Sequence, residues 1–312
     1  MDYSRYRIVF MGTPAFASNI LEGLFKQGYN IVSVVSQPDK LYGRKRELKA
    51  SEVKEKALEL SIPVLTPEKI REDYEGVLTY KPDLIITAAY GQFIPQVLLD
   101  YPKFGCINAH GSLLPRYRGG APIQRAIING EKQTGITIQY MVKQMDRGDI
   151  LAKKAIDIGI EDTNSTMFEK LSDLALDMLI DLLPKLFEGN VEALAQNEEE
   201  ATYAYNLEKE IEHVGFEEDV KKVYDHIRGL LDQPGAYFVY KNKKYKIEKA
   251  FYEECEGTEA GIFKGLEKDY LRIDCNNGFI KVYMIRPEGK NSMDAKAFYN
   301  GVGRNMAGER LE

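Results

Sequence analysis

The chain has 312 residues, of which 44% are hydrophobic and 29% are charged, and this is the composition of a globular protein long enough for two domains. Its net charge of −6 argues against a protein that coats nucleic acid through a general excess of cations, although a local basic patch is compatible with it. No apolar run reaches the length of about 18 residues that a membrane-spanning helix needs. The start of the chain does not resemble a signal peptide, so we expect a cytoplasmic protein without membrane contact.

The first half of the chain alternates short apolar runs with amphipathic stretches. Strands are predicted at residues 7–11, 31–35, 84–88, 106–110, 136–140 and 150–158. Helices are predicted at 14–27, 51–60 and 165–183, and we expect Pro184 to end or kink the last of them. This alternation is typical of an α/β, Rossmann-like, doubly wound fold with a mostly parallel sheet and ligands at the carboxyl ends of its strands.

The second half of the chain has a different pattern. Helical periodicity fades into an acidic, irregular stretch, which we interpret as a linker at residues 189–208 between domains at 1–188 and 209–312. Beyond it, a helix is predicted at 217–231 and short strands at 236–240, 245–250, 261–263, 270–274 and 279–285. Closely spaced short strands of this kind favour a small β-barrel.

Cysteine and histidine usage limits the chemistry that the chain can perform. Three cysteines, Cys106, Cys255 and Cys275, show no paired spacing, which argues against a disulfide scaffold and against a cysteine-rich zinc site. The only histidines are His110, His213 and His226, so any histidine chemistry must use one of them. We expect no metal.

The segment with the strongest functional signal contains Asn108 and His110. These residues are two apart on a predicted strand, so their side chains point to the same side. An amide donor next to an imidazole is suited to polarise a carbonyl group and to stabilise the oxyanion formed on nucleophilic attack. An isolated pair of this kind is more often a structural histidine beside a turn asparagine, but an apolar loop and the Gly119-Gly120 turn follow directly and favour function.

A second polar segment, Met145-Asp146-Arg147-Gly148-Asp149, offers a carboxylate partner for His110. A carboxylate beside an imidazole orients the ring and stabilises its protonated form. The same residue types are common in turns, and spacing alone leaves open which of the two aspartates acts.

Five segments together resemble the methionyl-tRNA formyltransferases, which belong to the folate-dependent formyltransferases. They follow one another in order along the N-terminal half: Phe10-Met11-Gly12-Thr13-Pro14, Gln37-Pro38-Asp39, Ala89-Tyr90-Gly91, Asn108-x-His110-Gly-Ser-Leu-Leu-Pro115 and Asp146-x-Gly-Asp149. The resemblance implies Asn108, His110 and Asp146 as catalytic residues. It also implies folate contacts at Ser112, Leu113, Leu114 and Pro115 and at Ala89, Tyr90 and Gly91.

The activity that this resemblance implies is direct formyl transfer from 10-formyltetrahydrofolate to the α-amino group of methionine on initiator tRNA. It further implies a monomer and an OB-like C-terminal domain whose basic face supports the tRNA. The family's Asn-Pro-Trp-Pro before that barrel is replaced here by Leu231-Asp232-Gln233-Pro234. Candidate cations for the basic face are Lys241, Lys243, Lys244 and Lys246, which alternation could equally place on a solvated edge strand.

Residues 37–49 form a locally basic segment with a net charge of +3. Taken alone, such a segment is typical of a solvated loop. The resemblance instead implies contact with the acceptor end of tRNA, with Arg44 matching the family's loop arginine and Lys45 standing where the family has glycine. The predicted tRNA-binding residues are Lys40, Arg44, Lys45, Arg46 and Lys49.

Three other functions remain open from the sequence. An N-formyltransferase acting on an amino-sugar nucleotide would use the same three catalytic residues on a different amine. A non-catalytic folate- or RNA-binding module would not need Asn108, His110 and Asp146 together. A formyltetrahydrofolate hydrolase would be expected to carry a regulatory N-terminal extension.

Overall fold

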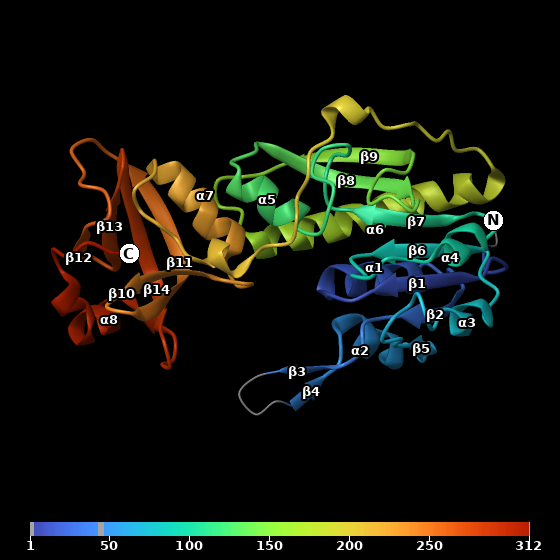
Figure 1. The fold of residues 1–312 in the computed structure, drawn as a ribbon, viewed down its shortest axis with the longest axis horizontal. Coiled ribbons are helices and arrows are strands. Elements are labelled where there is room, and N and C mark those ends of the chain that lie inside the picture. The colour runs from blue at the N-terminus through green and yellow to red at the C-terminus, as the bar shows by residue number, and fades with distance from the viewer. Residues whose placement is uncertain (1–2, 43–46, 312) are drawn as a thin grey trace. The chain divides into compact units, whose positions relative to one another are not determined.

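The computed structural model describes residues 3–42 and 47–311, which form two units with a β-sheet each (Figure 1). The first unit comprises Met1–Pro122, Thr134–Ile156 and Phe168–Tyr205. The second comprises Ile123–Gln133, Asp157–Met167 and Asn206–Glu312, so two short segments of the first half group with the C-terminal part.

A seven-stranded sheet with the order β5-β2-β1-β6-β7-β8-β9 organises the first unit. The strands are β1 (Ile8–Gly12), β2 (Ile31–Val35), β5 (Val64–Leu65), β6 (Leu84–Ala88), β7 (Cys106–His110), β8 (Gln133–Tyr140) and β9 (Ile150–Asp157). The pairs β2–β5, β1–β2, β1–β6 and β6–β7 are parallel, whereas β7–β8 is antiparallel. The expected doubly wound, mostly parallel α/β fold is therefore confirmed.

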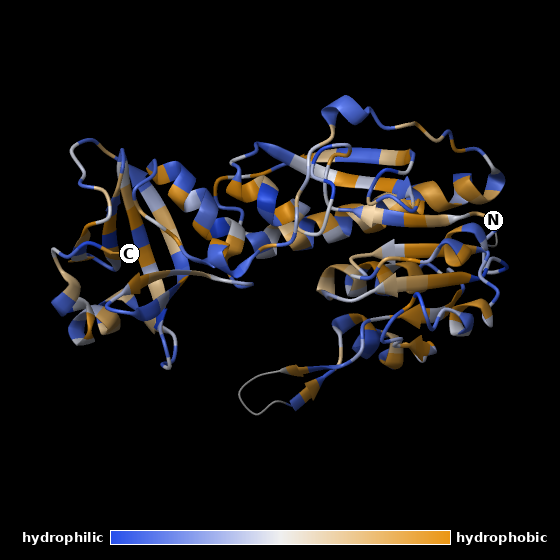
Figure 2. Cartoon of the chain, in the orientation of Figure 1, coloured by the Kyte–Doolittle hydropathy of each residue, from blue (hydrophilic) through white to orange (hydrophobic). Residues whose placement is uncertain are grey.

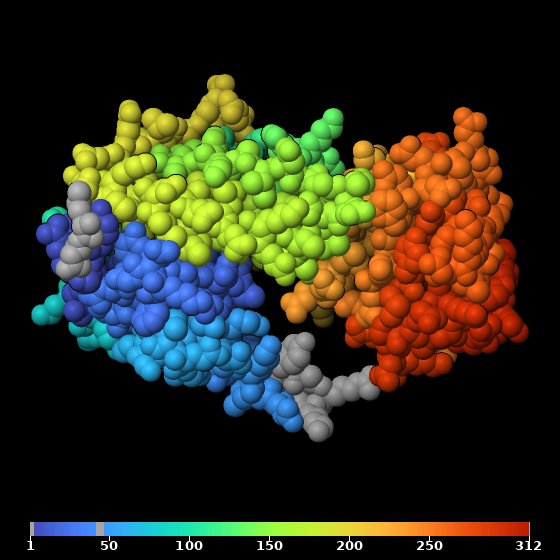
Figure 3. Space-filling model, turned by 180° about the vertical axis from the view of Figure 1, so that it is seen from behind, coloured from blue at the N-terminus to red at the C-terminus, as the bar shows by residue number. Residues whose placement is uncertain are grey.

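Both faces of this sheet are covered by helices. Every residue of β1 and β6 is buried, as expected for the continuous apolar runs that form the centre of a parallel sheet (Figure 2). The helices of the first unit are α1 (Ala15–Lys26), α2 (Glu52–Glu59), α3 (Glu75–Leu78), α4 (Gln96–Asp100) and most of α6 (Asn164–Glu188). The Ser172 hydroxyl of α6 donates to the carbonyl of Phe16 in α1 (2.8 Å), and the two helices adjoin on the rear face (Figure 3).

α6 continues through Pro184 to Glu188, so of the two expectations for this residue, that it ends the helix or kinks it, the first was wrong. Leu183, Leu186 and Phe187 are buried on the same helix, so the apolar stripe that packs the helix continues past the proline. Tertiary packing of this stripe outweighs the loss of one backbone hydrogen bond.

The predicted basic loop contains a short β-hairpin. Strands β3 (Lys40–Tyr42) and β4 (Glu47–Lys49) pair in antiparallel register, with Leu41 opposite Leu48 and Lys40 opposite Lys49. Residues 43–46 lie outside the described part of the chain.

The second unit is built on an antiparallel sheet with the order β10-β11-β14-β13-β12, to which β15 adds by pairing with β14. Its strands are β10 (Ala236–Tyr240), β11 (Lys243–Glu254), β12 (Phe263–Glu267), β13 (Tyr270–Cys275), β14 (Gly278–Pro287) and β15 (Met293–Asp294). Its helices are α5 (Pro122–Ile128), α7 (Val220–Leu230) and α8 (Ala295–Gly301), with short 3₁₀ turns at η2 (Lys209–Glu212) and η3 (Gly303–Met306). The expected smaller β-domain is confirmed.

A buried arginine of α7, Arg228, links this helix to the segment before α6 within this second unit. Arg228 contacts Asp225 at 2.6 Å and donates to the carbonyl oxygens of Gly159 and Asp162. These bonds explain why residues 157–167 group with the C-terminal part of the chain rather than with the sheet that precedes them.

Candidate active site

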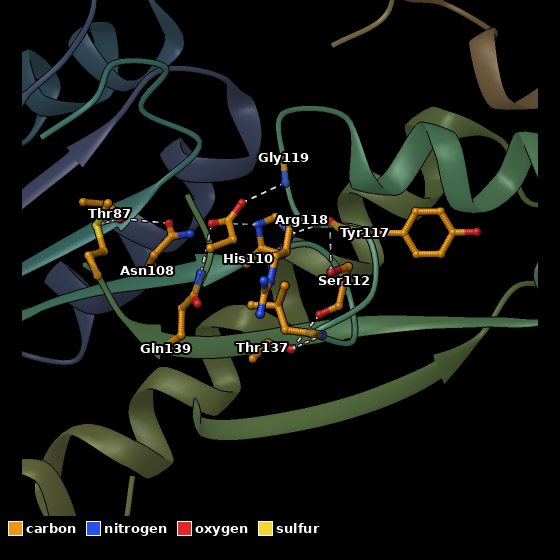
Figure 4. Close-up of polar contacts among 12 residues, drawn as sticks. Thr87, Asn108, His110, Ser112, Tyr117, Arg118, Gly119, Thr137 and Gln139 are labelled. Atoms are coloured by element: carbon orange, nitrogen blue, oxygen red, sulfur yellow. Dashed lines mark hydrogen bonds and ion pairs between the residues drawn. The ribbon is translucent and has the colours of Figure 1, made fainter. Parts of the chain in front are cut away.

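Strand register places a polar row across three adjacent strands of the first sheet. Thr87 on β6 lies opposite Asn108 on β7, which in turn lies opposite Gln139 on β8. His110 lies opposite Thr137 two residues further along β7, so this pair lies on the same face. Side chains of paired residues share a face of the sheet, so β7 and β8 place four polar side chains together (Figure 4).

Thr87 orients the amide of Asn108. The Thr87 hydroxyl lies 2.8 Å from Asn108 Oδ1 and donates to it, so the oxygen end of the amide is already bonded. The Nδ2 group, which can only donate, is therefore the end that remains for a reacting group. This contact turns a half-buried asparagine into a fixed hydrogen-bond donor.

His110 ends β7 and is held by a backbone contact from the loop that follows. Its side chain is only 6% exposed, and its Nε2 lies 2.9 Å from the carbonyl oxygen of Tyr117. Since a carbonyl only accepts, Nε2 carries a proton and donates it. Nδ1 therefore faces the carboxylate of Asp146, at 3.7 Å from Oδ1.

Asp146 is the aspartate of its segment that reaches His110, whereas Asp149 is exposed. The Asp146 carboxylate accepts hydrogen bonds from the Gly119 amide at 2.8 Å and from Gln139 Nε2 at 3.0 Å. With both oxygen atoms bonded, the carboxylate has one orientation relative to the imidazole.

The side-chain amide of Gln196, which is half-buried, supports the Asp146 loop. Its Nε2 donates to the carbonyls of Asp146 and Gly148, both at 2.8 Å, and lies 3.1 Å from Gln139 Oε1. A Cβ atom on Gly148 would lie 1.7 Å from the Tyr140 carbonyl oxygen, so the turn requires glycine at this position.

Arg118 connects Gln196 to a charged cluster. Its fully buried guanidinium donates to Gln196 Oε1 and lies 2.9 Å from Glu198, which also contacts Arg147 at 2.9 Å. The two arginines, Arg118 foremost, hold the pKa of Glu198 well below its usual range, at about 2. The buried charge of Arg118 is thus paired and hydrogen-bonded, as burial requires.

The backbone around Arg118 pairs with residues 202–204. The Arg118 amide donates to the Thr202 carbonyl (2.9 Å), and the Ala204 amide donates back to the Arg118 carbonyl (2.7 Å). Gly119 has φ +123°, and a Cβ atom there would lie 2.6 Å from the Ala204 carbonyl oxygen. We name residues 111–121 the catalytic loop and residues 196–204 the supporting segment.

Comparison with known proteins agrees with the resemblance. Residues 6–183 match the formyl transferase family, and residues 206–303 match the formyl transferase C-terminal domain. The methionyl-tRNA formyltransferase of Ligilactobacillus salivarius is 44% identical over 312 residues, covering 97% of this chain and 98% of its own length. The methionyl-tRNA formyltransferase of Lysinibacillus sphaericus is 41% identical over 303 residues, covering 96% and 97%.

The chain belongs to the methionyl-tRNA formyltransferase family.

Solved structures share the fold of this family member. An N-formyltransferase from Helicobacter canadensis, in complex with folinic acid and dTDP-3-aminofucose, gives a TM-score of 0.69 at 20% identity, covering 89% of this chain and 98% of that chain. The methionyl-tRNA formyltransferase from Clostridium thermocellum gives 0.58 at 21% identity, covering 80% and 94%. These two similarities concern the fold alone.

The predicted folate-contacting residues at the start of the catalytic loop are held rigidly. The Ser112 hydroxyl donates to the Arg116 carbonyl (2.7 Å), and the Leu114 amide donates to the Thr137 hydroxyl (3.1 Å). Ser112, Leu114 and Pro115 are buried, so Leu113 is the member of this group with a partly exposed side chain.

The predicted contacts Ala89, Tyr90 and Gly91 follow β6. The Tyr90 carbonyl accepts hydrogen bonds from the Thr13 hydroxyl (2.8 Å) and from Gln37 Nε2 (3.1 Å). The Tyr90 ring is buried, which raises the pKa of its hydroxyl, and this hydroxyl has no hydrogen-bond partner among the described residues. Contacts from this turn to a ligand would therefore come from its backbone.

The predicted tRNA-binding residues are described only in part. Lys40 and Lys49 pair across the β3–β4 hairpin, and Lys49 contacts Glu52 at 3.4 Å. Arg44, Lys45 and Arg46 lie outside the described residues.

Several contributors to the site were not found from the sequence. Gln139 alternates with apolar residues on a buried strand, a pattern that marks the same face as Thr137 and could have identified it. Gln196 and Glu198 fall in the stretch interpreted as a linker, and no local signal distinguishes them from its other polar residues.

Across 3–42 and 47–311, no group of three His, Cys, Asp or Glu side chains is arranged to hold a metal ion. Within the same ranges, no helix has the length and hydropathy required to cross a membrane.

Proposed function

We propose that this chain transfers the formyl group of 10-formyltetrahydrofolate to the α-amino group of methionine esterified to initiator tRNA. The observation that carries this proposal is the convergence of the Asn108 amide, the His110 imidazole and the Asp146 carboxylate in a member of the methionyl-tRNA formyltransferase family.

The reaction makes one carbon–nitrogen bond and breaks another. The lone pair of the neutral amine attacks the formyl carbon, and the carbonyl oxygen becomes an oxyanion in the tetrahedral intermediate. As this intermediate collapses, the bond to folate N10 breaks. The amine loses one proton, and N10 gains one, so the overall transfer is balanced.

Asn108 and His110 are suited to stabilise the oxyanion. The Asn108 Nδ2 group donates because Thr87 occupies its oxygen, and His110 Nδ1 donates when the ring is protonated. Donors held in place before the reaction stabilise charge as it develops without reorganising, which is the main source of rate enhancement in such sites.

Asp146 orients His110 and accepts the proton that the amine releases. Its carboxylate faces Nδ1, and two donors, Gly119 and Gln139, fix its direction. An acid–base group positioned in this way contributes typically 10²–10⁴-fold to the rate.

Folate and tRNA contacts complete the proposal. We assign the folate to residues 112–115 and to the turn at 89–91, and the acceptor end of tRNA to the basic segment with Lys40, Arg44, Lys45, Arg46 and Lys49. We propose a catalytic domain at 1–188 and an OB-like, tRNA-supporting domain at 209–312, in a monomer that works in the cytoplasm. Sedimentation with and without tRNA tests the monomer.

One assay tests the function against its alternatives. The protein is incubated with 10-formyltetrahydrofolate and, separately, with methionyl initiator tRNA, methionyl elongator tRNA or an amino-sugar nucleotide. We expect formyl-methionine to form on the initiator alone. Formylation of the sugar with untouched tRNA would replace the proposal by the sugar enzyme, and release of formate without any acceptor would indicate a hydrolase.

A further inference from the structure

Two tyrosines at the end of the first unit expose their rings and have no part in the site described above. Tyr203 and Tyr205 are 51% and 63% exposed, which is unusual for large aromatic side chains. Their ring centroids lie 5.7 Å apart and their planes differ by only 6°. Residues two apart on an extended segment point to the same side, and here they form a parallel pair.

The segment that carries the two tyrosines is hydrogen-bonded to the catalytic loop, which in turn contacts Asp146. Tyr203 forms a β-bridge with Arg118, and the neighbouring Ala204 exchanges backbone hydrogen bonds with Arg118 (2.7 Å) and Ala121 (3.1 Å). Between these two residues, the Gly119 amide donates to the Asp146 carboxylate. The tyrosines therefore lie on the segment that pairs with the catalytic loop, and Gly119 of that loop holds the carboxylate of Asp146.

Tyr203 is also held in place before any ligand arrives, and the ring of Tyr205 stacks on it. Tyr203 forms a side-chain hydrogen bond with Arg118, whose buried guanidinium is bonded to Gln196 and Glu198. An aromatic ring fixed in this way loses little conformational entropy when a flat ligand stacks on it.

The catalytic loop, which pairs with this segment, carries a cation whose guanidinium carbon lies 5.5 Å from the centroid of the Tyr117 ring. This cation is Arg116, which is exposed. Both of its neighbours on the loop that pair with the tyrosine segment do so through the backbone: the Pro115 carbonyl accepts from the Thr202 amide, and Arg118 forms a β-bridge with Tyr203. The carboxylate of Glu198, the nearest acidic group of the cluster, is already neutralised by Arg118 and Arg147. Stacking surfaces next to cations are the general means of binding single-stranded nucleic acid.

We propose that Tyr203 and Tyr205 form a stacking platform for the 3′-terminal nucleobase of the aminoacylated tRNA. This inference rests on the proposed function. The reacting amine belongs to an amino acid esterified to the terminal ribose, so one ribose and one ester separate the terminal base from the group that must meet His110 and Asp146. A base-stacking surface beside the catalytic loop is where that base would lie.

Fluorescence gives a direct test because the chain contains no tryptophan. Tyr205→Trp creates a single reporter, and Tyr101→Trp, at another exposed tyrosine (45%), is the matched control. We expect methionyl-tRNA to quench the reporter at 205 but not the control, and tRNA lacking its terminal nucleotide to leave both unchanged. Equal quenching by truncated tRNA, or absorbance-corrected quenching by folate alone, would overturn the proposal.

Kinetics provide the second test. Tyr205→Leu is expected to raise KM for methionyl-tRNA about tenfold with kcat at saturation retained, whereas Tyr205→Phe behaves as wild type. An unchanged KM in Tyr205→Leu would overturn the platform. The two failures are distinguishable, since the quenching assay measures binding without formyl transfer, and the proposed function depends on product formation by the wild-type protein.

Discussion

The catalytic loop and the supporting segment contribute to one site in opposite ways. The catalytic loop follows a strand that carries Asn108 and His110, and its residues form a motif that can be read in order along the chain. The supporting segment has no motif, yet its Gln196 and Ala204 bond the two sides of the same site. Chemistry is encoded locally here, whereas the rigidity of the site comes from residues about eighty positions away.

The largest expected effect comes from removing a reacting side chain of β7, rather than a residue that supports the site. His110→Ala should lower kcat by about 10²–10⁴-fold with little change in KM, because the lost group acts on the reacting atoms. The measurement is steady-state formylation of methionyl-tRNA. His213→Ala, at an exposed histidine of the second unit, is the control and should retain full activity. Near-normal turnover by His110→Ala would show that His110 does not take part in the reaction.

The second prediction tests the close contact between the catalytic loop and the supporting segment. In Gly119→Ala, the new Cβ would meet the Ala204 carbonyl at 2.6 Å, at a φ of +123° that alanine rarely adopts. We expect a loss of about 1–3 kcal/mol in the free energy of unfolding and a clear fall in kcat. Gly189→Ala also has a positive φ (+75°) but meets nothing within 4 Å, so comparing the two in urea sets a close contact at a strained φ against the left-handed region in open space. Equal losses would show that backbone strain alone matters.

The third prediction concerns Gln196, which supports the Asp146 loop without touching the reacting atoms. Gln196→Leu leaves the carbonyls of Asp146 and Gly148 without their donor. Leaving buried polar groups unpaired costs about 1–3 kcal/mol, and we expect kcat to fall about tenfold while KM for folate stays constant. Glu199→Ala, in the exposed 3₁₀ turn η1 (Glu198–Glu200), is the control. A loss in Tm with unchanged kcat would make Gln196 purely structural.

The smallest expected effect is a pH dependence of stability. The pKa of Glu198 is lowered from 4.5 to about 2 by its bonds to Arg118 and Arg147. A lowered folded-state pKa means that the ionised group stabilises the fold above pH 4.5, and that this contribution disappears as the pH falls towards 2. Wild type should therefore exceed Glu198→Gln in urea resistance at pH 6, with a smaller difference at pH 3. An equal difference in urea resistance at pH 6 and at pH 3 would show that the ion pairs of Glu198 with Arg118 and Arg147 do not stabilise the fold.

Much of the fold follows from local sequence. The bounds of β2, β6, β7 and β10 agree with the predicted ranges, because continuous or alternating apolar runs bounded by turn residues specify a strand locally. The helix through Pro184 and the β3–β4 hairpin were not predicted. The first depends on tertiary packing of Leu186 and Phe187, and the second on cross-strand pairing, neither of which a single stretch of sequence reveals.

The candidate site was predictable to a similar degree. The residues that the motif contains, Asn108, His110 and Asp146, are brought together by the structure. The contributions of Gln139 and Gln196 depend on strand register and on a return of the chain after α6, and these are properties of the folded molecule. Periodicity could have indicated Gln139, but nothing local indicates Gln196.

The course of the supporting segment defines where this protein can be cut. A fragment that stops at Glu188, the end of α6, would keep every strand of the first sheet but lose Gln196 and Glu198. Arg118 would then lose the hydrogen bonds of its guanidinium to Gln196 and Glu198 and the pairing of its backbone with residues 202–204. The shortest fragment that keeps the first unit intact therefore ends at Tyr205, well beyond its last helix.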